Sequence, residues 1–239
     1  MFDKVIKLTK GAGNGINSAC LMTASNMLIG KGEKGDEVTC QCSLIRTFVI
    51  TTNDSMPSKL RCKLYSPLIY EIIGTKTTDP DVIQQRAFAF ADWAVREIAP
   101  LSLRAIGLKA QGELLEALDP ICCRKTAMHA AAAAFLASSD AVRQASSDVS
   151  FTRICSVSSV CNSASSSAAF SSNAGPSFYS TDAAGHAAAA ASTLGNLNQT
   201  AADNVWSKCP DIIRRVASIG DKRPVEAVMS IHQLQEALI

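Results

Sequence analysis

The chain has 239 residues, a length at which one large domain or two small ones can bury a core without disulfide bonds. Only 5% of the residues are aromatic and 18% are charged, and the formal net charge is +2. The lysines and arginines are dispersed along the chain, which excludes the dense basic face that neutralises many phosphates, so nucleic acid is not a favoured partner. A core with so few aromatic residues has to be built from small, closely packed side chains.

Nine cysteines occur at irregular spacing, and the first ten residues mix charged and apolar side chains without a continuous hydrophobic segment. This pattern predicts free thiols in a reducing compartment and no signal peptide, so we expect a cytoplasmic protein. The most apolar stretches, 44–50 and 130–136, are far shorter than the roughly 20 residues that a membrane span requires. The sequence therefore predicts a soluble protein that does not enter a membrane.

The first 120 residues are predicted to form amphipathic helices separated by turns. Asn17 or Ser18 can cap the first helix, which ends at Gly30. The apolar segment 44–50 fits a β-strand or a buried helix, and its context favours the helix. Asn53 and Asp54 are predicted to lie in the turn that follows it and to cap the next helix. The remaining helices of this half are expected at 57–73, 80–98, 101–108 and 114–118, with Pro100 as an interruption or bend.

From Ile121 to Ala174 there is neither glycine nor proline, and Ala and Ser fill about half of the positions between Thr126 and Val205. This composition predicts helices with small side chains. Met128, Phe135, Val142 and Val149 recur every seven residues, as expected for the larger side chains along one seam of a helix that otherwise makes its contacts through Ala and Ser. Because serine hydroxyls compete for backbone hydrogen bonds, helix breaks are predicted at 146–150 and 163–167.

The last part of the chain predicts four further helices, which begin near residues 180, 198, 210 and 224. The sequence as a whole predicts an all-α, multi-helix bundle with a long Ala/Ser-rich helical region in its C-terminal half. Two regions are expected, an amphipathic one at 1–120 and an Ala/Ser-rich one at 121–239 that packs against the first. Alanine-rich helices bury too little area to be stable without something larger to pack on.

Cys20 is the candidate nucleophile, because a cysteine in the first turn of a helix has its thiol pKa lowered by the helix dipole. A thiol hydrolase would also need a histidine as a base. The three histidines, His129, His186 and His232, lie in helical contexts, and no strand is predicted to carry one of them to Cys20. The simpler interpretation makes Cys20 a core residue beside Leu21.

The other candidate sites have simple structural explanations. Cys40, Cys42, Cys62 and the pair Cys122-Cys123 do not match recurrent zinc spacings, so we expect buried thiols and no metal.

The glycine-rich segment 11–15 lacks the Lys-Ser/Thr of a phosphate-binding loop, so a flexible connection and no cofactor are expected. Asp92 is either a functional polar residue or a residue at a solvated helix position. His129 and His186 are expected on helix surfaces, and the alternative is that they line a groove between helices.

Four short motifs carry a resemblance: Ser-Ala-Cys-Leu-Met-Thr at 18–23, Thr-Asn-Asp-Ser-Met-Pro at 52–57, Ile-Gly-Thr at 73–75, and Asp-Trp-Ala-Val-Arg at 92–96 before Ala99-Pro100. With these motifs, segment 18–108 resembles a group of proteins encoded by phages and prophages. In that group the segment precedes a long Ala-rich tail, commonly with tyrosine between alanine pairs. Here Ser replaces many of those positions. The resemblance implies a viral accessory context and brings no particular activity with it.

These observations favour a non-catalytic helical interaction protein of phage or prophage origin, in the cytoplasm of a bacterial host. Its expected partner is a host or phage protein. The specific activity that we expect is inhibition of a component of anti-phage defence. Ala/Ser helices that pack closely also favour a homo-oligomer. The alternatives are a cysteine hydrolase that uses Cys20 and a sponge that encloses a nucleotide signal between helices.

Overall fold

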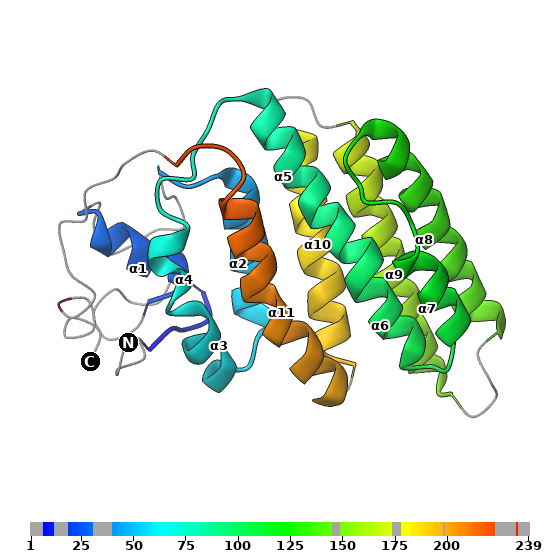
Figure 1. Cartoon of the computed structure of the whole chain (residues 1–239). Coiled ribbons are helices and arrows are strands. Elements are labelled where there is room, and N and C mark those ends of the chain that lie inside the picture. Colours follow the sequence, from blue (N-terminus) through cyan, green and yellow to red (C-terminus); the bar gives the residue numbers. More distant parts are fainter. Residues whose placement is uncertain are drawn as a thin grey trace.

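The structure is a computed structural model, and it describes residues 7–11, 19–30, 40–144, 149–173, 178–197, 199–222 and 233. Within these residues the fold is a bundle of helices, and the only strand-like pairing described is an isolated bridge between Leu8 and Ala19 (Figure 1). The predicted all-α class is confirmed. The helices are α1 (Leu21–Leu28), α2 (Ser43–Ser55), α3 (Ser58–Tyr65), α4 (Leu68–Glu71), α5 (Pro80–Trp93), η1 (Ala94–Ile98), α6 (Ala99–Arg104), α7 (Lys109–Glu116), α8 (Arg124–Gln144), α9 (Phe151–Ser172), α10 (Phe178–Gly195) and α11 (Gln199–Ala217).

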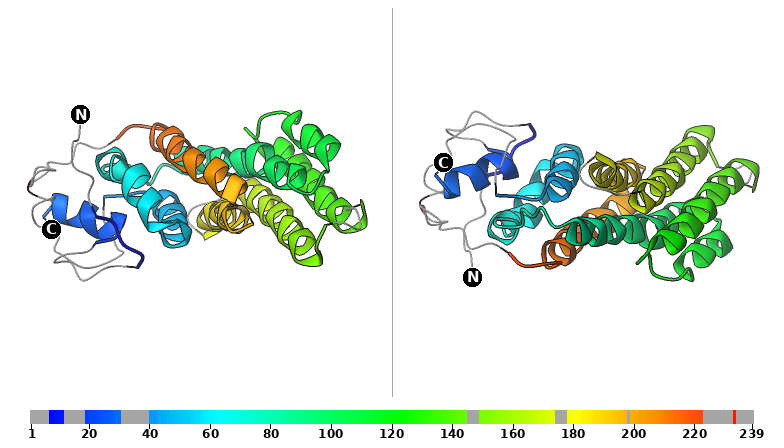
Figure 2. Two further views of the ribbon diagram at one scale, coloured as in Figure 1. Left: turned by 90° about the horizontal axis from the view of Figure 1, so that it is seen from below. Right: turned by 90° about the horizontal axis from the view of Figure 1, so that it is seen from above.

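Helix α10 lies at the centre of the bundle and contacts α2, α9, α5 and α11 (Figures 1 and 2). Its buried positions are almost all alanine, a side chain short enough to let neighbouring backbones approach on several sides at once. Contacts of α10 thus join helices from before residue 120 to helices from after it. The fully buried alanines of this helix are Ala183, Ala184, Ala187, Ala188, Ala190 and Ala191.

Helices α8, α9 and α10 lie side by side in an antiparallel layer (Figure 1). Serine hydroxyls bond across this layer, because short side chains bring each hydroxyl within reach of a backbone carbonyl on the next helix. The three bonds run from Ser138 Oγ to Ser158 O at 3.1 Å, from Ser165 Oγ to Ala131 O at 2.8 Å and from Ser167 Oγ to Ala183 O at 2.7 Å.

Helices α5, η1 and α6 follow one another as one long rod, which packs against one face of this layer. Its middle segment, Ala94–Ile98, is a π-helix that ends directly before Ala99 and Pro100. Proline has no N–H to donate, and its ring presses on the carbonyl four residues earlier, so the α-helical hydrogen-bond pattern has to change there. The rod therefore changes its hydrogen-bond pattern before Pro100 and does not end there.

Asp92 is buried in the rod, so the alternative that placed it at a solvated helix position is wrong. Its carboxylate accepts hydrogen bonds from Arg96 at 3.1 Å, from Arg215 of α11 at 3.3 Å and from the backbone N–H of Ile121 at 3.0 Å. A buried carboxylate has to be paired to offset its desolvation. Asp92 thereby ties α5 to α11 and to the segment that leads into α8.

Arg86 is a second buried charge and lies on the same helix, nearer the start of α5. Its guanidinium donates to Thr75 O at 2.5 Å and twice to Ile219 O, at 2.7 and 3.2 Å. Ile219 follows the end of α11, where backbone carbonyls lack partners within the helix. Arg86 therefore caps the end of α11 and fixes it against α5.

Several predicted boundaries were wrong. Asn53 and Asp54 belong to the last turn of α2 and do not cap the following helix, whose N-cap is Pro57. The first helix begins at Leu21 with Cys20 as its N-cap, whereas the predicted caps Asn17 and Ser18 lie outside the described residues.

The Ala/Ser-rich half also differs from its predicted breaks. Helix α8 ends at Gln144 and α9 begins after Ser150, near the first predicted break, but α9 runs without interruption through 163–167. Within that segment the Ser165 and Ser167 hydroxyls donate to Ala131 O and Ala183 O of the neighbouring helices, so they do not compete for the backbone hydrogen bonds of α9. Pro210 lies inside α11 and does not open a helix, and the last predicted helix, 224–238, falls almost entirely outside the described residues.

Among the described residues, no helix combines the length and the apolar character needed to cross a bilayer.

Two glycines of α10 give a matched test of the packing. A Cβ added at Gly195 would lie 2.2 Å from Cζ2 of the buried Trp206, whereas one at Gly185 would meet only Thr47 Cγ2 at an ordinary 3.5 Å. We expect Gly195→Ala to lower the free energy of unfolding by about 1–3 kcal/mol through overpacking. Gly185→Ala should raise it by about 0.5–1 kcal/mol through helix propensity. Urea denaturation followed by circular dichroism measures both, and an unchanged Gly195→Ala stability would contradict the packing.

Candidate functional site

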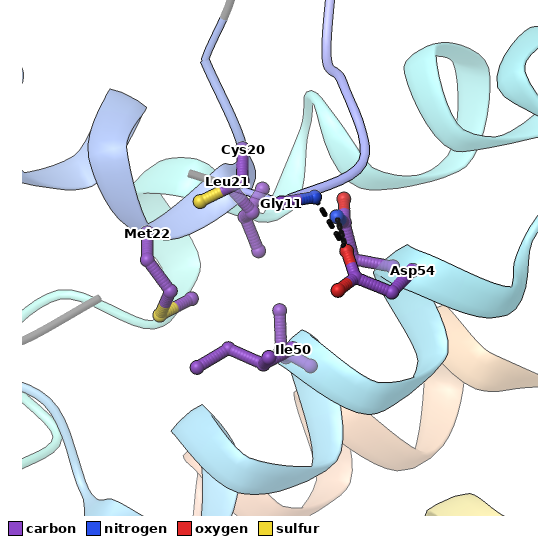
Figure 3. Close-up of a pocket in the computed structure, with 8 residues that line it drawn as sticks. Gly11, Cys20, Leu21, Met22, Ile50 and Asp54 are labelled. Carbon is purple, nitrogen blue, oxygen red and sulfur yellow. Dashed lines mark hydrogen bonds between the residues drawn. The ribbon is translucent and has the colours of Figure 1, made fainter. Parts of the chain in front are cut away.

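Cys20 lies in a small pocket between the start of α1 and α2 (Figure 3). It is only 4% exposed, and as the N-cap its sulfur accepts a hydrogen bond from the Thr23 N–H at 3.4 Å. The Thr23 hydroxyl lies 3.5 Å from the same sulfur. The thiol itself therefore caps the start of α1, as the side chain of a serine or an aspartate caps other helices.

Asn53 and Asp54 lie on the α2 side of this pocket. Asp54 Oδ1 accepts hydrogen bonds from the Gly11 N–H at 2.8 Å and from Asn53 Nδ2 at 3.0 Å, and Asn53 Nδ2 also donates to Thr9 O at 3.0 Å. These bonds attach the segment before α1 to the end of α2. The Cys20 thiol points away from the Asp54 carboxylate, so the two groups do not form a pair (Figure 3).

The volume of this pocket is about 20 Å³, room for about one water molecule. Ligand pockets for nucleotide-sized molecules measure about 300–1,000 Å³, so the pocket as it stands does not fit one. No histidine is among the described residues that line it. His129 and His186 lie on α8 and α10, and His232 is outside the described residues.

The remaining cysteines are distributed over the fold. Among the described residues, no group of three or more His, Cys, Asp or Glu side chains lies close enough together to hold a metal ion. Cys62 accepts a hydrogen bond from the Leu8 N–H at 3.2 Å, and Cys42 is buried at the start of α2. Burial raises the pKa of the Cys161 thiol to about 12, which keeps it protonated.

Cys122 and Cys123 differ from these because both are exposed, just before α8. The Thr126 hydroxyl accepts from both of their backbone N–H groups, at 3.1 and 3.2 Å, and lies 3.6 Å from Cys123 Sγ. Hydrogen bonds from the Thr126 backbone and hydroxyl lower the pKa of the Cys123 thiol.

The seven-residue seam on α8 does not point into the core. Met128, Phe135 and Val142 are 52%, 58% and 59% exposed, and the inward face of α8 consists of small residues such as Ala127 and Ala134. The spacing correctly grouped Met128, Phe135 and Val142 on one stripe, whereas Val149 lies beyond the end of α8 and packs against the core. The stripe faces outward because only small side chains are short enough for the close contact with α9. We call Met128, Phe135 and Val142 the α8 ridge.

A groove with a volume of about 350 Å³ runs beside the ridge, over the outer face of α9. His186 of α10 forms its far wall and stacks on Phe170 with ring centroids 5.2 Å apart. Burial lowers the pKa of His186, and the nearby Asp182 opposes this shift. The groove is lined by Val142, Cys155, Ser158, Ser159, Asn162, Ser163, Ser166 and His186.

A second groove, of about 310 Å³, lies on the other side of α8, against α7. Leu114 and Leu136 stand at its edges and are 70% and 60% exposed. Leu115, Leu118, Ala133 and Ala137 complete an apolar lining, and Gln111 and Asp140 form a polar rim. Grooves of this kind bind apolar side chains of a partner.

Comparison of the chain with protein families, with curated proteins and with solved structures found no match. The geometry of the molecule therefore carries the functional argument.

Replacement of Cys20 by Ser tests the thiol directly. Serine keeps an N-cap acceptor for the Thr23 N–H, so we expect the helical content to stay the same by circular dichroism. The biological effect of the chain should also persist, because the interaction protein expected from the sequence needs no nucleophile. A catalytic cysteine would instead lose most of its rate on replacement by serine. A folded Cys20→Ser variant without that effect would contradict this expectation and support the hydrolase.

The exposed thiols give a pH-dependent prediction. A lowered pKa leaves more Cys123 as thiolate at neutral pH, so Cys123 should react with iodoacetamide faster than the exposed Cys155 of α9. Peptide mass spectrometry after timed alkylation between pH 6 and 9 measures both rates. Replacing Thr126 by Val removes the hydroxyl bond and should slow the reaction of Cys123, and an unchanged rate would be the contrary result.

Proposed function

We propose that the chain is a non-catalytic interaction protein that binds an amphipathic helix of a partner protein in the groove between α7 and α8. The observation that carries the proposal is the exposure of Leu114 and Leu136 on the two edges of one apolar groove. Large apolar side chains gathered in this way favour a binding surface over a solvated one.

The shape of the groove supports a helix as the ligand. Its walls are two helices, and an amphipathic helix places apolar side chains at every third or fourth position, which such walls can receive. The Gln111 amide donates to Gln144 Oε1 at 2.7 Å across the two walls, so α7 and the end of α8 are held at a fixed spacing. A fixed groove reduces the ordering cost of binding.

The position of α7 is also fixed from the other side. Arg104 of α6 forms an ion pair with Glu116 of α7 through both terminal nitrogens of its guanidinium, and a Cβ at Gly112 would lie 3.2 Å from Pro100 O. The absence of a side chain at Gly112 lets α7 lie against α6. The groove therefore rests on a rigid floor, which suits a partner that binds without remodelling the bundle.

The proposed setting is the cytoplasm of a bacterium, where the chain, as a protein of phage or prophage origin, inhibits a component of anti-phage defence. The resemblance of segment 18–108 to phage and prophage proteins supports this setting. A small protein that occupies a surface of a defence component needs a binding groove and no catalytic centre, and the described residues offer such a groove.

The test combines infection with binding. Expression of the chain should raise the plating efficiency of a phage on a strain that carries a defence system the phage cannot otherwise overcome. Leu136→Ser should remove this effect and the co-purification of the defence component, because a polar group in the groove weakens apolar burial. Phe135→Ser is the matched control, because Phe135 is the neighbour of Leu136 and is equally exposed, but lies on the ridge and not in the groove. If Leu136→Ser keeps full effect and Phe135→Ser removes it, the groove is not the binding site.

A further inference from the structure

We infer that the ridge and the groove over α9 form a self-complementary face, on which a second copy of this chain binds about a two-fold axis parallel to α9. This face lies on the side of α8 away from the α7 groove, so the inference goes beyond the proposed function.

The ridge and the groove have matching lengths. From Met128 to Val142 the ridge spans about 21 Å at 1.5 Å per residue, and from Cys155 to Ser166 the groove spans about 17 Å. The ridge carries three large apolar side chains, while the floor of the groove carries serines and one asparagine. A face with a ridge beside a groove fits a copy of itself, because a two-fold rotation places each ridge over the groove of the other copy.

The direction of the helices selects the axis. Helix α8 starts beside the end of α9, where Ser172 Oγ lies 3.3 Å from Met128 Sδ, and α10 starts shortly after that end. The starts of α8 and α10 therefore lie at the same end of the layer (Figure 1). An axis parallel to α9 lays the ridge of one copy in the groove of the other, between that copy's α8 and α10, with the starts of α8 and α10 at the same end.

Charges at this end are complementary. Arg124 lies one turn before Met128 on the ridge stripe, and Lys125 is its exposed neighbour. Asp182 lies one turn before His186 on α10, close enough to influence its pKa. The two-fold axis parallel to α9 brings Asp182 of each copy toward Arg124 of the other. An axis across the helices would instead set α8 against α8, with Arg124 facing Arg143 and ridge on ridge, which like charges disfavour.

The available area fits a stable dimer. Helices of 21 and 22 residues are about 30 Å long, and three of them at 8–10 Å spacing form a face about 20 Å wide. This offers on the order of 600 Å² per copy and about 1,200 Å² in total, the lower end of the range for specific interfaces.

Sedimentation equilibrium of the purified full chain over a concentration series tests the inference, with circular dichroism to verify folding. A concentration-dependent dimer is expected. Phe135→Glu should raise its dissociation constant at least tenfold, whereas Leu136→Glu, at the adjacent and equally exposed position, should leave it unchanged. Asp182→Lys and the pair Arg124→Glu with Lys125→Glu should each weaken the dimer, and the three changes together should restore it.

A folded chain that stays monomeric at every concentration overturns the inference. So does a dimer that Leu136→Glu breaks and Phe135→Glu does not, since that dimer would use the α7 groove. Failure of the charge-reversed variants to restore association would overturn the assigned axis. None of these outcomes depends on plating efficiency, so the proposed function is judged separately.

Discussion

The fold depends on the close approach of α10 to four other helices. Ala183, Ala187 and Ala190 are completely buried, and on a helix of this kind a longer side chain at any of these positions would push a neighbour away. Because α10 contacts α2, α5, α9 and α11, this one helix fixes the relative positions of these four helices. Alanine also has the highest helix propensity, so the same residues favour the local structure and the packing.

Two buried charged residues fix the register between helices, which alanine packing alone does not determine. Close contact between smooth helices permits sliding, whereas a carboxylate with three donors has one position in which all are satisfied. Asp92 binds Arg96, Arg215 and the Ile121 N–H in this way, and Arg86 binds two carbonyls nearer the start of α5. The register of α5 against α11 is therefore set at two points. Removing one partner would leave a buried charge without compensation, which is more costly than the pair is stabilising.

The sequence was sufficient for the helical class, for the helix start at Pro80 and for a break near Ser150, because these depend on local chemistry such as a capping aspartate or serine. It was insufficient where the decision lay in contacts between distant segments. Nothing in the sequence near Asp92 indicates that Arg215 is its partner, so the burial of Asp92 could not be inferred. The ridge shows a different failure: a seven-residue repeat states which side chains share a stripe, but the direction of that stripe depends on how closely α9 approaches. The interpretation of Cys20 as a residue of the apolar interior agrees with its burial. Asn53 and Asp54, which line the same pocket, were predicted in a turn but belong to the last turn of α2.

The inverted pattern of α8 links the packing to the proposed function. A helix at the edge of a bundle normally turns its large apolar residues inward and its small or polar ones outward. Helix α8 does the opposite, because its inner face has to fit against an equally small-sided α9, and so Phe135 and Leu136 are both left in contact with solvent on adjacent stripes. Exposure of this extent is unusual in a protein that acts as an isolated monomer. The same alanine content that permits the tight bundle thus displaces the large apolar side chains to the surface, where they are available to bind other chains.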